Sequence, residues 1–135
     1  MLDWLRMLGR KRGHPLKGAP TIQRRKTYTS ESGYVYEYYY QGQRPAQRAN
    51  ARGTEFVFQV SPDRRHWFQV CVLLSGAAVE SWECDRRPLS STECYAIAKM
   101  SLFQAFDERE PSQMRREIVA RRADIDAILD QLGID

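Results

Sequence analysis

The side chains best suited to acid–base, nucleophilic or metal chemistry are two histidines and three cysteines. His14 lies in a basic stretch with nearby prolines, where no neighbouring group would orient its ring. In the strand pairing proposed below, His66 falls opposite Asp85, and a histidine–aspartate pair can act as an oriented base. Because no hydroxyl or thiol nucleophile shares that face, we interpret this pair as an ion pair at the end of a strand.

The cysteines are scattered and form no Cys-x-x-Cys pair; they are Cys71, Cys84 and Cys94. A zinc site that combines them with His66 is excluded by their spacing and by the strand faces on which they fall. No glycine-rich phosphate loop, Gly-x-Ser-x-Gly or His-Glu-x-x-His motif occurs. We therefore expect no catalytic residue, no metal and no cofactor. An odd number of unpaired thiols favours a reducing compartment, and we predict the cytoplasm.

Positive charge is concentrated at the N-terminus. Residues 1–30 contain eight basic residues against Asp3 alone, a net charge of +7, whereas the rest of the chain has 13 basic and 16 acidic residues. Such a segment suits a polyanion such as nucleic acid or an anionic membrane surface, although a solubilising tail would have the same composition. Glycines and prolines indicate a linker, so we interpret residues 1–20 as a basic arm and linker. The predicted contact residues that follow it are Arg24, Arg25 and Lys26.

A second basic stretch, residues 42–53, lacks large apolar side chains and has an arginine at every fourth position, at Arg44, Arg48 and Arg52. The stretch is long for a hairpin connection, and long loops are often functional or disordered. We interpret it as a mobile loop. Its arginines could join the arm in contacting nucleic acid, because the planar guanidinium suits phosphate and base stacking.

Aromatic side chains alternate along residues 34–41, which we expect to form a strand paired with residues 22–29. The even-numbered positions are all tyrosine, and they include Tyr36 and Tyr38. A row of tyrosines on one strand face can serve as a stacking platform for bases. A strand of high β-propensity whose hydroxyls reach water would have the same pattern, and we favour this second interpretation.

Three further strands are expected in an antiparallel meander over residues 55–60, 66–74 and 77–84. Pairing residue 60 with 66, and 74 with 77, gathers phenylalanine and valine side chains on one face, which we predict to be the core face. A slip of one residue would scatter them, so the pattern specifies the face of each strand.

In this pairing Phe58 lies beside Phe68, and the opposite face of the sheet carries Trp67 and Trp82. If it is uncovered, a face with two tryptophans would be a binding surface. If the N-terminal arm covers it, the same face would be a second small core. We weigh coverage at least as highly as exposure and keep both tryptophans as candidate binding residues.

A capping box opens a long helix over residues 89–109, because Ser90 is followed three positions later by Glu93. A second helix is predicted over residues 112–132, where apolar side chains recur at heptad spacing. We expect it to pack on the first helix. The alternative is a homodimer or protein partner that binds through the stripe containing Ile118, Ile125 and Leu132.

These patterns predict an α+β fold, in which an antiparallel four- to five-stranded sheet is followed by two C-terminal helices packed on one face. Residues 21–135 form a single domain behind the arm of residues 1–20. No run approaches the roughly 18 apolar residues that a transmembrane segment requires.

We predict a non-catalytic binding module that contacts single-stranded nucleic acid through the basic arm and the arginine-rich stretch. The alternative is a protein-interaction or self-association domain that uses the C-terminal helix or the face with Trp67 and Trp82. A small-ligand binder or an enzyme is the interpretation least supported by motifs.

Overall fold

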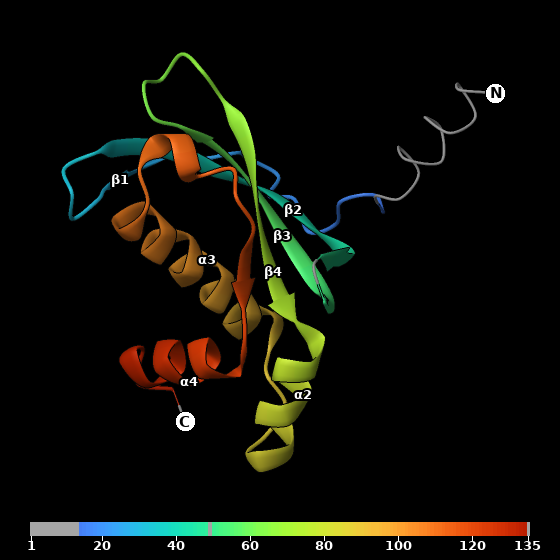
Figure 1. Cartoon of the computed structure of the whole chain (residues 1–135). Coiled ribbons are helices and arrows are strands. Elements are labelled where there is room, and N and C mark those ends of the chain that lie inside the picture. The colour runs from blue at the N-terminus through green and yellow to red at the C-terminus, as the bar shows by residue number, and fades with distance from the viewer. Residues whose placement is uncertain (1–13, 49, 135) are drawn as a thin grey trace.

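A computed structural model of the chain describes residues 14–48 and 50–134, and Figure 1 shows how its elements are arranged. The first 13 residues of the predicted arm lie outside the described part. The elements in chain order are β1 (Lys26–Thr29), β2 (Val35–Arg48), β3 (Ala51–Ser61), β4 (Phe68–Ser75), α2 (Gly76–Asp85), α3 (Ser91–Glu108), the 3-10 turn η1 (Pro111–Gln113), β5 (Ile118–Ala120) and α4 (Arg122–Gln131). Helix α3 lies across one face of the sheet (Figure 1).

The five strands form one sheet in the order β1-β2-β3-β4-β5. The first four are antiparallel to their neighbours, but β5 runs parallel to β4 and pairs Ile118 with Val72. The α+β class is therefore confirmed, while the prediction of a purely antiparallel sheet is wrong. The chain passes through α2 and α3 before it returns as β5, and a long crossover of this kind can bring a strand back in the same direction.

The core lies between the sheet and α3. Its fully buried side chains include Phe56, Phe58, Val70 and Val72 from the strands and Leu102 and Phe106 from α3. The predicted core face is confirmed, but the register of β3 and β4 differs, because Phe58 pairs with Val70 instead of Phe68. The difference is two positions, and strand side chains alternate with a period of two, so each side chain keeps its face.

Residues 77–84 belong to helix α2 and not to a strand, which corrects the predicted meander. Strand β4 runs directly into this helix, and the Ser75 hydroxyl accepts a hydrogen bond from the Ala78 amide at 3.3 Å as its N-cap. Serine followed by glycine suits a tight turn and a helix start equally well, so the local sequence did not decide between them. As a result, Trp82 lies in the core and is only 2% exposed.

Residues 42–53 form the far end of a β2–β3 hairpin, which corrects the predicted mobile loop. Pairing continues as far as Arg48 opposite Ala51, beyond a bulge between Tyr40 and Gly42. The composition of this stretch gives little β signal. The pairing depends on the partner strand and on side-chain contacts that are described below.

The N-terminal linker is docked on this hairpin. Lys17 and Gln43 donate to each other's carbonyl oxygens at 2.8 Å in both directions. The two chain segments pass so close that a Cβ on Gly42 would lie 2.7 Å from the Lys17 carbonyl oxygen, and Gly42 has a φ of 137°. Residues 17–24, called segment 17–24 below, therefore run beside β2 before the chain enters β1.

The predicted helix over residues 112–132 is divided into η1, β5 and α4, so α2, α3 and α4 take the place of the two expected C-terminal helices. Ile118 is buried in β5 and Ile125 in the core, whereas Leu132 is 41% exposed. These side chains share no surface, and the dimer interface predicted through them is not available. The heptad spacing in the sequence reflects the inward-facing residues of the short strand β5, followed along the chain by those of helix α4.

Helix α3 begins as predicted. The Ser90 hydroxyl accepts from the Glu93 amide at 3.1 Å, and Glu93 Oε1 accepts from the Ser90 amide at 2.9 Å. This reciprocal pair satisfies two backbone donors at the helix start. Within the part of the chain that the structure describes, no helix is both long and apolar enough to cross a membrane.

Candidate functional site

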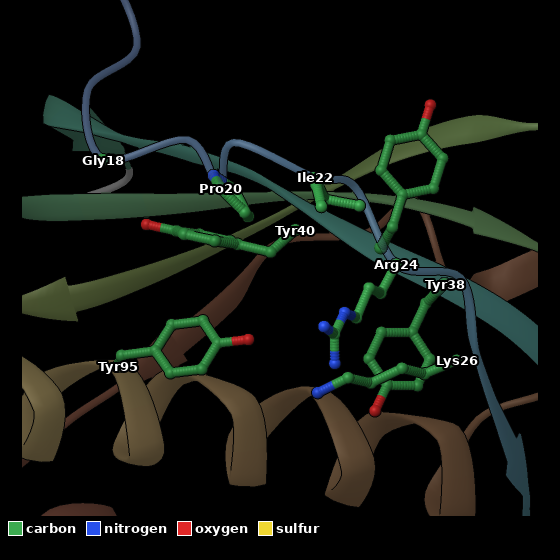
Figure 2. A pocket seen from close by; sticks show the side chains of 9 residues that line it. Gly18, Pro20, Ile22, Arg24, Lys26, Tyr38, Tyr40 and Tyr95 are labelled. Carbon is green, nitrogen blue, oxygen red and sulfur yellow. The ribbon is translucent and has the colours of Figure 1, made fainter.

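A pocket of about 390 Å³ opens between segment 17–24, strand β2 and helix α3. Tyr38 and Tyr40 border it from β2, and Tyr95 borders it from α3 (Figure 2). The other lining residues are Gly18, Pro20, Ile22, Arg24, Lys26 and Tyr39. The nitrogen-bearing ends of Arg24 and Lys26 point into the same space as the Tyr95 hydroxyl (Figure 2). We call this cavity the tyrosine-lined pocket.

Tyr95 is the α3 residue that borders the pocket, and Lys99 and Phe103 follow it at spacings of four along one face of the helix. The Tyr95 ring centroid lies 4.8 Å from that of Tyr40, with the ring planes at 62°. The Phe103 ring lies 5.6 Å from that of Tyr38, edge to face. Lys99 therefore lies between these two contacts, on the side of α3 that faces β2.

Arg24 and Lys26 bring positive charge to the lining of this space, and Lys99 of α3 lies beside Lys26. Lys26 arrives from β1, where it is the cross-strand partner of Tyr38. Burial, and then the nearby Lys26 ammonium, lowers the pKa of Lys99 to about 8. None of the lining residues is acidic, and among residues 14–48 and 50–134 no ion pair involves Arg24, Lys26 or Lys99. The pocket is therefore electropositive without an internal counter-ion, which suits an anion.

The tyrosine hydroxyls add hydrogen-bond donors to this charge. Burial raises the pKa of Tyr38 to about 12, and it raises the pKa of Tyr40 equally. Burial also raises the pKa of Tyr95. These hydroxyls consequently stay protonated at neutral pH, where each can donate one hydrogen bond to an anion or a base edge.

Arg44 and Arg48 are engaged elsewhere. Arg44 Nε lies 3.0 Å from Glu55 Oε1, and Arg48 Nη2 lies 3.1 Å from Glu55 Oε2. Glu55 is fully buried and alternates with Phe56, so it lies on the sheet face opposite α3. Because the charge of Arg44 and Arg48 is balanced by Glu55 within the hairpin, these two arginines are not part of the candidate site. The third predicted arginine, Arg52, is exposed on β3 and does not line the tyrosine-lined pocket.

A second cavity, of about 240 Å³, lies on that opposite face and is bordered by Glu55, Cys71 and Arg115 among others. Burial, and then the Glu55 carboxylate, raises the pKa of the Cys71 thiol to about 11. A thiol with a raised pKa is protonated at neutral pH and is a weak nucleophile. The chemistry of this cavity is therefore that of a buried ion pair beside an unreactive thiol.

The tyrosines of β2 do not form an open stacking platform, because α3 covers their face. Tyr36 is fully buried and stacks on Phe106, with ring centroids 4.3 Å apart and planes at 17°. Tyr38 is only 4% exposed, although its side chain borders the pocket. Tyr40 is half-buried and offers more of its ring to a ligand. Tyr36 is thereby removed from the candidate site, while Tyr38 remains.

The two tryptophans do not share a face. Trp82 is buried in α2, and the guanidiniums of Arg86 and Arg87 lie 5.8 and 5.6 Å from its ring. Trp67 is half-buried just before β4. The Arg25 guanidinium lies 5.0 Å from the Trp67 ring. The predicted face with two tryptophans is therefore absent, and Arg25 packs on Trp67 outside the tyrosine-lined pocket.

His66 is paired with Asp63 instead of Asp85. Its Nδ1 lies 2.6 Å from Asp63 Oδ2, whereas Asp85 lies in α2 and pairs with Arg122 at 3.0 Å. Hydrogen bonds from the His66 backbone and ring hold the pKa of Asp63 well below its usual range. In the described residues, no group of three or more histidine, cysteine, aspartate or glutamate side chains is placed to hold a metal ion.

Comparison with protein-family models, with curated proteins and with solved structures finds no match to this chain. The fold and the site therefore define the class on their own, as an α+β domain with a mixed sheet and a cationic, tyrosine-lined pocket. Arg24, Lys26 and Tyr38 were predicted as contact residues and meet at this pocket. Tyr95 and Lys99 were missed, and their spacing of four was the signal available.

Proposed function

We propose that the chain is a non-catalytic binding module that takes an unpaired nucleotide of a single-stranded nucleic acid into the tyrosine-lined pocket. The observation that supports the proposal is one cavity with tyrosine rings, Arg24 and Lys26 and, among the described residues, no lining carboxylate. Aromatic rings stack on bases of any sequence, and basic side chains neutralise the phosphates between them.

The size of the pocket favours one nucleotide unit. Its volume of about 390 Å³ falls in the range of roughly 300–1,000 Å³ that small-ligand pockets occupy. A base can reach the rings of Tyr40 and Tyr95 only if it is free of its complement. We therefore expect single strands to bind more tightly than duplex of the same sequence.

The basic N-terminal segment extends the proposed contact beyond the pocket. Lys17, Arg24, Arg25 and Lys26 precede or begin β1, and residues 1–13 carry further arginines and a lysine in the sequence. Neighbouring phosphates of the strand would meet this charge. The arginines of residues 42–53 are not part of this proposal. A cytoplasmic location is part of it.

The alternative function, a protein-interaction or self-association domain, loses the surfaces on which it was based. Trp82, Ile118 and Ile125 are all buried within the chain. The exposed side chain of Leu132 is the part of the predicted stripe that stays accessible. No observation favours this function over the first.

A titration with matched double variants tests the proposal. Arg24→Met with Lys26→Met removes two charges from the pocket. Arg25→Met with Lys17→Met removes the same charge from the same part of the chain, at two residues that do not line the pocket. A labelled oligothymidylate should bind the unmodified protein at low salt, with a log–log salt slope of about −0.7 per contacted phosphate. The pocket double variant should lose about ten-fold in affinity, and the control should lose distinctly less.

Two results would contradict the proposal. One is the absence of binding by the unmodified protein at low salt. The other is an equal loss in both double variants, which would mean that net charge and not the pocket determines affinity. A duplex of the same length, titrated in parallel, should bind more weakly than the single strand.

A further inference from the structure

Two cationic side chains line the tyrosine-lined pocket, and a third lies beside one of them. Arg24 comes from segment 17–24 and Lys26 from β1, and Lys99 of α3 lies next to Lys26 without lining the pocket itself. Lys99 is fixed between the Tyr95–Tyr40 and Phe103–Tyr38 ring contacts, and its Nζ lies 5.7 Å from the Phe103 ring centroid. Like charges are brought together here at an electrostatic cost that a bound anion would remove.

The amount of charge indicates the kind of anion. An internal phosphodiester carries a single negative charge, whereas a phosphate monoester carries about −1.5 to −2 at pH 7 and presents three acceptor oxygens. Arg24 and Lys26 in the lining, with Lys99 beside Lys26 and no carboxylate among the described lining residues, match the monoester better than the diester. The burial of Lys99 beside Lys26, which lowers the pKa of Lys99, adds support because a dianion would stabilise both ammonium groups.

The shape of the pocket indicates the position of the ligand along a strand. Segment 17–24 passes over it, with Pro20 and Ile22 on one side and Tyr95 on the other (Figure 2). Two backbone hydrogen bonds between Lys17 and Gln43 attach the start of this segment to β2. A cavity bounded by this segment, by β2 and by α3 has room for the terminal nucleotide of a strand.

From this geometry we infer that the pocket recognises a nucleotide bearing a phosphate monoester, with the monoester between Arg24, Lys26 and Lys99 and the base against Tyr40 and Tyr95. The ligand is the phosphorylated end of a single strand or a free mononucleotide, which share this chemistry. The inference rests on the proposed function and adds to it the chemical group that the pocket recognises, a phosphate monoester. The basic segment before β1 favours a nucleic acid over a phosphotyrosine peptide, because it continues the positive charge along a strand.

The test compares oligothymidylates of one length with a 5′-phosphate, a 3′-phosphate or hydroxyls at both ends. The unmodified protein should bind one of the phosphorylated strands about ten-fold more tightly than the hydroxyl strand. Inorganic phosphate should compete with the phosphorylated strand. Thymidine monophosphate, titrated alone, shows whether a free nucleotide is enough for binding or whether the rest of the strand is required. Either result supports the inference. Thymidine, which lacks the phosphate, should bind more weakly than the monophosphate.

Variants at Lys99 assign the preference to the pocket. Lys99→Met should reduce the ratio of affinities for phosphorylated and hydroxyl strands to near one, and Lys99→Arg should restore most of it. Lys17→Met, which removes the same charge outside the pocket, should keep the full ratio. Thermal unfolding of each variant checks that the fold is intact, because Lys99→Met removes a like-charged neighbour of Lys26 and also the cation–π contact with Phe103.

The outcomes separate this inference from the proposed function. Equal affinity for phosphorylated and hydroxyl strands would overturn the inference and leave single-strand binding in place. Absence of binding to every strand would overturn both. Tighter binding of a phosphotyrosine peptide than of any phosphorylated strand would assign the pocket to a protein partner and would also overturn the inference.

Discussion

Glu55 on β3 holds Arg44 on β2 through an ion pair of 3.0 Å on the sheet face opposite α3. The two residues are also direct cross-strand partners, so the ion pair and the backbone ladder specify the same register. Arg48 reaches the second carboxylate oxygen at 3.1 Å. A fully buried carboxylate thus organises the end of the hairpin that carries the arginines.

Removal of this carboxylate should destabilise the protein strongly. Glu55→Ala leaves the half-buried Arg44 guanidinium without its partner, and breaking one side of a buried pair costs about 3–5 kcal/mol in the free energy of unfolding. Glu37→Ala is the matched control, because Glu37 pairs at 2.9 Å with Arg64, whose side chain is 74% exposed. Such a surface pair contributes below about 1 kcal/mol. Urea unfolding measures both, and equal losses would contradict the account.

The parts of the fold that were predictable are those with a local signal. Ser90 and Glu93 form their capping box because both partners lie within one helical turn. The core faces of β3 and β4 were predicted because an antiparallel pairing gathers Phe56, Phe58 and Val70 on one face. The exact register of β3 and β4 was not predicted, because a shift of two positions keeps every side chain on its face.

The parts that were missed depend on contacts distant in sequence. The pairing of residues 42–48 is favoured by Glu55 across the hairpin and by Lys17 against Gln43, and neither contact is visible in a window of a few residues. The helix α2 depends on Ser75 as a cap, in a sequence that also suits a turn. The pocket itself exists because α3 packs Tyr95 against Tyr40 of β2, which only the tertiary fold determines.

Acid stability should depend on Glu93. Two hydrogen bonds from Arg87, at 2.9 and 2.8 Å, together with the Ser90 amide, lower the pKa of Glu93 from 4.5 to about 2. A carboxylate with a depressed folded-state pKa contributes stability above its unfolded pKa, and this contribution is lost as the pH falls through the folded value. The stability difference between the unmodified protein and Glu93→Gln should therefore shrink between pH 4.5 and about 2. Thermal melts over this range measure it, and a constant difference would argue against the Arg87 contact.

Binding of a phosphorylated strand should weaken as the pH rises through the pKa of Lys99, which is about 8. Above that pH the folded protein loses the Lys99 proton and with it one of three positive charges at the monoester. The titratable group that acts on Lys99 is Lys26. Tyr38 and Tyr40, which line the pocket, have a pKa of about 12 and stay neutral over this range.

The measurement is the affinity for the phosphorylated oligothymidylate between about pH 7 and 9, a range in which the monoester stays close to fully ionised. Lys99→Arg is the control, because arginine keeps its proton over this range and should flatten the profile. A fall in affinity of the same size in Lys99→Arg would show that another group is responsible.

The most direct test of the central claim is to locate the bound strand by NMR. Titration of a short single-stranded oligonucleotide into isotope-labelled protein should shift the backbone amide signals of Lys26, Tyr40 and Tyr95, which line the tyrosine-lined pocket, and of Lys99 beside Lys26. The chemical shifts of the amides beside Glu55 and Cys71, on the opposite sheet face, should not change. Shifts confined to that opposite face, or no shifts at millimolar oligonucleotide, would contradict the claim that this pocket binds single-stranded nucleic acid.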